Sequence, residues 1–199
     1  MNPKPTLLCI PDISGFTEFM SKVDFDLGSK VIPSLLNNII YSNNIGLKIS
    51  EIEGDAVLFY KQGKLPSFGD LINQCKKFYT DFYFHIDELI KKEDSARAKD
   101  IPKILGLKII LHFGEEIAHV KVGKHIKLIG EDVITAHKLL KNDIAKNEYI
   151  LLSEKLLAQF NENFNEVITW EKLQSDVVYD EHVGEIQLQY IDLSPLKPV

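Results

Sequence analysis

The sequence predicts an α+β fold, organised as a single domain over residues 1–199. Three observations predict it: the length suits one sizeable core, helix-like and strand-like patterns are mixed along the chain, and no repeat or low-complexity linker divides it. The first part of the chain runs strand, helix, strand, strand, helix, strand, which is the split βαβ order of ferredoxin-like folds. Extra strands are expected after this core, toward the C-terminal end.

The composition narrows the classes of function. The chain is 45% hydrophobic and 26% charged, its net charge is −6, and Lys and Arg form no block. Nucleic-acid binding through phosphate neutralisation needs a basic footprint, so we expect no nucleic-acid partner. We also expect no membrane span and a cytoplasmic location, because no apolar run of about 18 residues occurs and the N-terminal run is too short for a signal peptide. Cys9 and Cys75 lie in apolar runs, which predicts reduced core cysteines.

Periodicity predicts the elements of the first half. The apolar run at 6–10 is typical of a buried strand, and a helical region opens around Ser14-Gly15-Phe16-Thr17. Gly28 and Pro33 predict a break between this helix and a second one through residue 40. Residues 47–53 and 56–60 predict a hairpin around Gly54-Asp55, and apolar spacing of three and four predicts a long helix over 69–92.

The second half is read in the same way. Residues 93–103 are expected to form a charged loop, and 105–113 with 117–122 a hairpin around Gly114-Glu115-Glu116. A helix is expected from Gly130 to residue 141, then a strand at 149–152 and a short helix capped by Ser153. The stretches EVITW, DVVYD and EIQLQYIDL predict strands in the tail.

Two aspartates are the strongest candidate site residues. In a split βαβ unit, the end of the first strand lies beside the start of the third, which brings Asp12 close to Asp55. Two carboxylates this close repel each other unless a cation or a shared proton intervenes. Mg²⁺ and Mn²⁺ suit such oxygen ligands, so the pair predicts a divalent-metal site. Taken singly, Asp12 also suits a helix cap and Asp55 a hairpin turn.

A glycine lies three residues after Asp12. Gly15 precedes a helix start, where the amide N–H groups of Gly15, Phe16 and Thr17 are available to an anion such as a phosphate. No Ser/His/Asp or Cys/His arrangement is indicated by the order of residues alone.

Five motifs in order resemble the class III nucleotide cyclase catalytic domain, the family of adenylate and guanylate cyclases. PDISGFTEFM resembles that family's first metal motif, and EIEGDAVLF resembles the hairpin that carries its second metal aspartate. LGLKIILHFGEEIAHVKVG, IKLIGEDVITAHKLLK and YILLSEKLL resemble the elements that follow. The resemblance covers roughly residues 5 to 160, and GEIQLQYIDL matches the closing strand.

The resemblance implies roles for individual residues. Asp12 and Asp55 would be metal ligands, with Ile13 adding a backbone carbonyl, and the metal would be Mg or Mn. Glu51 stands where guanylate-type members read guanine, and Lys127 stands at the second base-reading position. The partner would be a purine nucleoside triphosphate, held between the two chains of a head-to-tail homodimer.

The sequence departs from the family after Gly130. Ile134 stands where the ribose-orienting Asn is expected, Lys138 where the transition-state Arg is expected, and Glu181 or His182 where the phosphate-binding Lys is expected. Because Ile134 offers nothing polar and Lys138 lacks the fork of Arg, we expect a catalytically degenerate cyclase-like domain that binds a metal–purine nucleotide or acts as a sensor or regulatory module. The alternatives are an active guanylate or adenylate cyclase that makes a cyclic nucleotide, and a dimerising scaffold without ligand.

Overall fold

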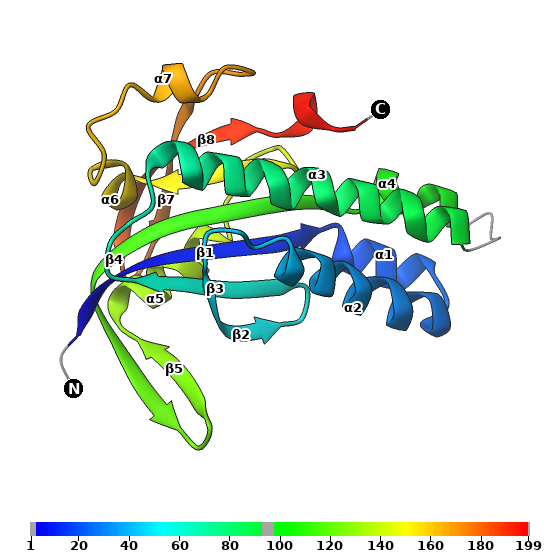
Figure 1. Cartoon of the computed structure of the whole chain (residues 1–199), viewed down its shortest axis with the longest axis horizontal. Helices are drawn as coiled ribbons and strands as arrows, with labels where there is room; N and C mark the ends of the chain where they lie inside the picture. The colour runs from blue at the N-terminus through cyan, green and yellow to red at the C-terminus, as the bar shows by residue number, and fades with distance from the viewer. Residues whose placement is uncertain (1–2, 93–97, 199) are drawn as a thin grey trace.

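The computed structural model describes residues 3–92 and 98–198, in which eight strands form one sheet (Figure 1). The strands are β1 (Lys4–Ser14), β2 (Lys48–Glu53), β3 (Ala56–Gln62), β4 (Gly106–Val122), β5 (His125–Ile129), β6 (Tyr149–Ser153), β7 (Gln174–Asp180) and β8 (Gly184–Asp192). Their order is β2-β3-β1-β4-β6-β8-β7, and β5 pairs with the far part of β4. Paired strands are antiparallel except β4 and β6, which run parallel.

The first four strands confirm the expected ferredoxin-like core. They run in the order β2-β3-β1-β4, so β1 is central, and β1 is antiparallel to β3 on one side and to β4 on the other. This is the arrangement of a split βαβ unit, and β5 to β8 extend it as the predicted additional strands.

Helices cover both faces of the sheet. They are α1 (Phe16–Lys22), α2 (Phe25–Tyr41), α3 (Phe68–Lys92), α4 (Ile101–Ile104), α5 (Glu131–Leu139), α6 (Glu154–Leu157) and α7 (Phe164–Val167). Two 3₁₀ turns accompany them, Ala98–Asp100 and Ser194–Leu196. Figure 1 shows α2 and α3 lying along one face, while the apolar side of α5 packs on the other, against Leu8 and Ile10 of β1.

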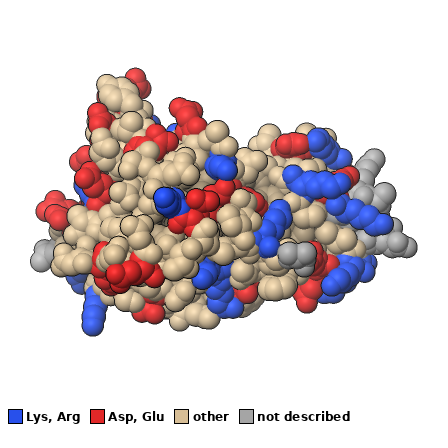
Figure 2. Space-filling model, turned by 90° about the horizontal axis from the view of Figure 1, so that it is seen from above, with Lys and Arg blue, Asp and Glu red and all other residues tan. Residues whose placement is uncertain are grey.

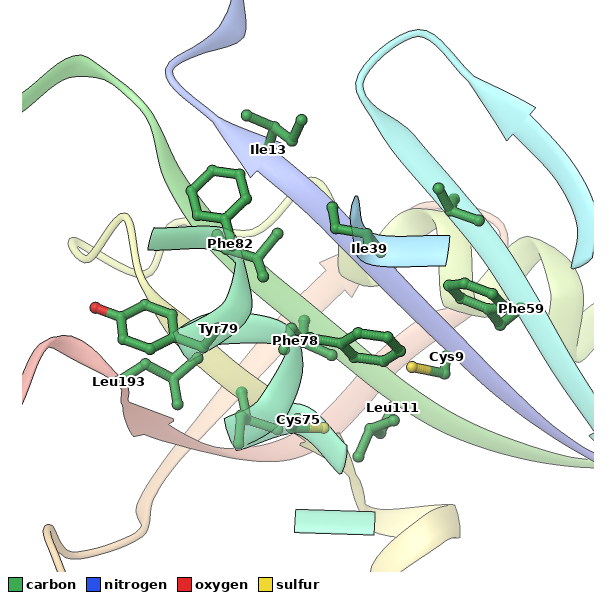
Figure 3. Packing of buried hydrophobic residues seen from close by; sticks show 14 of the residues in the cluster. Cys9, Ile13, Ile39, Phe59, Cys75, Phe78, Tyr79, Phe82, Leu111 and Leu193 are labelled. Carbon is green, nitrogen blue, oxygen red and sulfur yellow. The ribbon is translucent and has the colours of Figure 1, made fainter. Parts of the chain in front are cut away.

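The larger core lies between the sheet and α2 and α3. Alternate residues of β1 point into it, and Cys9 meets Phe78 and Cys75 of α3 there (Figure 3). Both cysteines are buried and free, as the sequence predicts. Because side chains alternate along a strand, the even-numbered residues of β1, Asp12 among them, face the side that carries α5.

The expected position of the break between the first two helices, at Gly28 and Pro33, is wrong. Helix α2 runs unbroken through both Gly28 and Pro33, and the boundary with α1 lies at Asp24, whose side chain accepts a hydrogen bond from the Leu27 N–H. Gly28 serves close packing, because a Cβ there would lie 2.9 Å from the end of the Met20 side chain.

The hairpin expected around Gly114-Glu115-Glu116 is also wrong. β4 is 17 residues long and continues through these three residues without a turn. The chain reverses only at Gly123, which has a φ of 60° and precedes β5. Gly114 is needed for close approach, since a Cβ on it would lie 2.4 Å from the Cβ of Asp132 in α5. Figure 1 shows the far half of β4 and β5 extending as an arm away from the sheet.

Two smaller expectations need correction. Part of EVITW lies in helix α7, which begins after the capping residue Asn163, whereas DVVYD and EIQLQYIDL form the expected β7 and β8. The charged loop expected at 93–103 lies partly outside the described residues, and its described part forms a 3₁₀ turn followed by the start of α4.

The surface carries charges of both signs. Figure 2 shows Lys and Arg interspersed with Asp and Glu on the face that it presents, in keeping with the net charge of −6. None of the helices in the described ranges combines the length and the apolar character needed to cross a membrane.

Candidate functional site

The structure brings Asp12 and Asp55 together. Asp12 lies near the end of β1 opposite Ala56, the first residue of β3, and Asp55 lies in the turn just before it. The backbone N–H of Ile13 donates to the Asp55 carbonyl over 3.0 Å, which fixes the β2–β3 turn against the end of β1. In an extended strand the C=O of a residue points to the same side as its N–H, so the Ile13 carbonyl also points toward this turn.

The two carboxyl groups influence each other. Burial raises the pKa of Asp55, and the neighbouring Asp12 raises it further through its charge and a hydrogen bond between the two side chains. The Asp12 side chain is 12% exposed, so water screens this interaction only in part. The pair therefore needs a positive charge or a shared proton.

Lys108 supplies a positive charge. It lies directly opposite Asp12 on β4, and its Nζ is 3.1 Å from Asp12 Oδ2 and 3.3 Å from the Leu140 carbonyl. This ammonium also opposes the rise in the pKa of Asp55. Lys108 is a site residue that the sequence reasoning missed, although a single lysine inside the apolar run LGLKIIL signals a buried partner.

The donor set fits one kind of metal. In residues 3–92 and 98–198, no three His, Cys, Asp or Glu side chains are grouped to hold a metal ion by themselves. Two carboxylates and a carbonyl nevertheless suit Mg²⁺ or Mn²⁺, which typically take one or two protein carboxylates together with substrate phosphates. Asp12, Asp55 and the Ile13 carbonyl are thus the residues that would hold such an ion.

Gly15, Phe16 and Thr17 follow Asp12 closely in the chain, after the end of β1. Gly15 adopts φ of 79° at the start of α1, Phe16 packs partly on the core, and Thr17 is exposed. The first N–H groups of a helix have no partners within it, so such amides are available to an anion. Their binding role remains a prediction.

Glu51 and Lys127 form a second group, on β2 and β5. Lys127 Nζ donates to Glu51 Oε2 over 2.8 Å, and this contact raises the pKa of Lys127. The pair borders an open hollow of about 530 Å³, which is lined on its apolar side by Leu128, Val133 and Ile134. His137 and Glu53 also line it, with 4.0 Å between His137 Nδ1 and Glu53 Oε2.

Lys138 points away from this hollow. Its Nζ lies 2.6 Å from Asp180 Oδ2, at the turn between β7 and β8. The hydrogen bond from Lys138, helped by the His182 backbone N–H, lowers the pKa of Asp180 to about 2. Glu181 and His182 follow on the exposed part of the same turn, so the expected phosphate-binding end carries acidic residues beside its lysine.

A Ser–His–Asp network lies behind α5 and was also missed. His112 Nδ1 is 2.8 Å from Ser153 Oγ, and His112 Nε2 is 3.1 Å from Asp132 Oδ1, which also accepts from Lys155 over 2.7 Å. Burial acts to raise the pKa of Asp132, but the His112 and Lys155 hydrogen bonds outweigh it and lower the pKa. Ser153 is 1% exposed and caps α6 by accepting from the Leu156 N–H, so this network joins β4, α5 and β6 structurally.

Sequence comparison connects the chain with proteins of unknown activity. Residues 32–149 match the model of a family described as "Protein of unknown function (DUF2652)". The chain is 30% identical over 152 residues to "Uncharacterized protein Rv2561/Rv2562" of Mycobacterium tuberculosis (strain ATCC 25618 / H37Rv), across 75% of this chain and 68% of that protein.

Structure comparison identifies the fold. The chain is similar to a bacterial light-regulated adenylyl cyclase, with a TM-score of 0.67 and 12% identity, but it spans only 55% of that chain. It is also similar to the guanylate cyclase domain of RhGC from Catenaria anguillulae in complex with GTP, with a TM-score of 0.60 and 18% identity across 96% of this chain and 97% of that one. The adenylyl cyclase CyaB from P. aeruginosa gives a TM-score of 0.61 at 15% identity. At such identities the likeness establishes the fold, which is that of nucleotide cyclase domains.

Proposed function

Because the chain belongs to the DUF2652 family of unknown function and has the nucleotide cyclase fold, we propose that it binds a divalent metal together with a purine nucleotide, as a homodimer without cyclase turnover. The observation that carries the proposal is the meeting of Asp12 and Asp55 at the end of β1. A pair of partly buried carboxylates is costly unless positive charge compensates for both, and Lys108 supplies only one charge, so the placement of the pair at this position of a cyclase fold favours a metal.

The chain's own residues would divide the work at the metal end. Asp12 and Asp55 hold the cation, and the Ile13 carbonyl completes the protein's share of ligands. A bound divalent cation supplies positive charge for the phosphates of the nucleotide. The amides of Gly15, Phe16 and Thr17 then face the phosphates from the start of α1.

The hollow beside Glu51 suits a purine ring. Leu128, Val133 and Ile134 give it an apolar side, and the Glu51–Lys127 pair gives it one polar edge. Guanine presents two N–H donors beside a carbonyl acceptor, which matches a carboxylate beside an ammonium. We therefore expect a preference for guanine over adenine.

The arrangement favours a homodimer. Neither Asp12 nor Asp55 lines the hollow beside Glu51, and this separation supports a nucleotide that lies between two chains. Two exposed isoleucines line the hollow, Ile129 and Ile134, which are 53% and 54% exposed. Such apolar side chains are typical of a surface covered by a partner.

Turnover is not expected, because the groups that would stabilise the transition state are missing. Ile134 is apolar, and the Lys138 ammonium is held by Asp180 at 2.6 Å. Loss of one such donor typically lowers the rate by about 10²–10³-fold.

Calorimetric titration of the protein with GTP and with ATP, each with Mn²⁺, tests the proposal. We expect the wild type to bind Mn²⁺–GTP more tightly than Mn²⁺–ATP. Asp55→Asn should weaken binding at least about tenfold, since a charge-assisted contact contributes roughly 1.5–3 kcal/mol. Asp176→Asn, on the exposed edge strand β7, is the matched control and should bind like the wild type.

A product assay on the same samples separates the alternatives. Absence of nucleotide binding by the wild type contradicts the proposal and leaves the dimerising scaffold. Cyclic nucleotide formed by the wild type and lost in Asp55→Asn contradicts degeneracy and establishes an active cyclase.

A further inference from the structure

We propose that Lys108 is a built-in cation that occupies the carboxylate pair until a divalent metal displaces it, and that it thereby lowers the affinity of the pair for metal. This inference rests on the proposed metal site at Asp12 and Asp55 and concerns how that site is regulated.

The geometry places Lys108 where a metal would bind. Its Nζ lies 3.1 Å from Asp12 Oδ2, and its charge acts on Asp55 as well. The side chains of Lys108 and Asp12 are 22% and 12% exposed, so their attraction is screened less than that of a surface pair. An ammonium and a divalent cation compete for the same carboxylate oxygens.

The Lys108 ammonium also has a second hydrogen-bond acceptor nearby. Its Nζ is 3.3 Å from the carbonyl of Leu140, the C-cap residue of α5, where the helix dipole favours a positive charge. On metal binding the ammonium can therefore leave Asp12 and keep this carbonyl as its partner. The displaced lysine thus stays in contact with the helix that carries Ile134 and Lys138.

The consequence is a connection between the Asp12–Asp55 pair and the hollow beside Glu51. The state of the carboxylate pair decides how strongly Lys108 holds the end of α5. Because α5 lines the hollow beside Glu51, metal binding at one group is communicated to the other through one side chain.

The test measures Mn²⁺ binding without nucleotide, by the loss of the electron paramagnetic resonance signal of free Mn²⁺. Lys108→Met should bind Mn²⁺ about tenfold more tightly than the wild type, since it removes a competing charge-assisted contact. Lys146→Met is the matched control, because Lys146 forms a similar pair with Asp192, at 2.8 Å, and should leave Mn²⁺ affinity unchanged.

The outcomes separate this inference from the proposed function. If the wild type binds Mn²⁺ and Lys108→Met binds it equally or more weakly, the inference is overturned while the metal site remains. If neither protein binds Mn²⁺, the metal site itself is overturned. A measurement on the wild type needs no variant: the Lys108 ammonium signal in NMR should shift on addition of Mg²⁺ while that of Lys146 does not, and an unchanged Lys108 signal contradicts displacement.

Discussion

The lysines of the candidate site are each paired with a carboxylate. Lys108 lies on Asp12, Lys127 on Glu51, and Lys138 on Asp180, with nitrogen–oxygen distances of 3.1, 2.8 and 2.6 Å. A nucleotide or metal has to replace these contacts, so part of its binding energy goes into breaking them. At the scale of residues, the three lysines of the site are already neutralised by carboxylates of the same chain.

The contribution of the Lys138–Asp180 pair to stability should depend on pH in the acid range. An unfolded Asp has a pKa of about 3.9, whereas that of Asp180 is lowered to about 2. The stabilisation from this pair is therefore fully present above about pH 4 and is lost as the pH falls toward 2. Lys138→Met removes the main donor, and carboxyl NMR titration should show the pKa of Asp180 rising toward the ordinary range. The pKa of Asp192, paired with Lys146, is the internal control and should not move.

Asp132 gives a second prediction at this scale. Asp132→Ala removes the acceptor for His112 Nε2 in the buried network, so the free energy of unfolding should fall by about 1–3 kcal/mol, the cost of an unsatisfied buried donor. Urea denaturation measures it. Lys155→Ala removes the other partner, which is 60% exposed, and should cost less than about 1 kcal/mol. Equal losses in the two variants would contradict the structural role given to His112.

Two glycines, Gly15 and Gly123, occupy backbone conformations that disfavour other residues. Gly15 has φ of 79°, and a Cβ there would lie 2.0 Å from the Ile104 carbonyl oxygen. Gly15→Ala should therefore destabilise the protein by more than the roughly 1–2 kcal/mol of a left-handed conformation, because backbone has to move. Gly123 has φ of 60° with nothing within 4 Å, so Gly123→Ala should cost only the conformational part. Thermal unfolding of both variants compares the two, and a smaller loss for Gly15→Ala would refute the steric argument.

Glycine packing also explains which elements the sequence could predict and which it could not. Apolar periodicity located β1, α3 and the β2–β3 hairpin, because their patterns reflect burial directly. It failed at Gly28 and Gly114, where glycine makes room for Met20 and for Asp132 in place of forming a break or a turn. Contacts of this kind join residues of different elements, and the local sequence pattern carries no record of them.

Some residues of the candidate site could be predicted from the sequence, and others could not. The meeting of Asp12 and Asp55 followed from strand order alone, since topology fixes which strand ends are neighbours. Lys108 and Asp180 could not be assigned, because their partners depend on the register of β4 and on the direction of the β7–β8 turn. Their roles come from tertiary structure.

At the scale of the whole molecule, the main prediction is self-association. Ile134→Glu and Ile129→Glu place a charge among the exposed apolar side chains beside the Glu51 hollow, so they should convert a dimer to monomer in sedimentation velocity. Phe25→Glu, at an 82% exposed position on α2, is the control and should leave the dimer intact. A wild type that sediments as a monomer at all concentrations contradicts the proposed homodimer.

The central position of β1 has a consequence for how the chain is made. Thr6 of β1 pairs with Gly114 of β4, so that edge of the first strand has no partner until more than one hundred further residues have been synthesised. A chain still emerging from the ribosome carries an open, apolar strand edge throughout this interval. We therefore expect the N-terminal strand to be the segment that most needs protection by chaperones during translation, and the sheet to complete late and slowly.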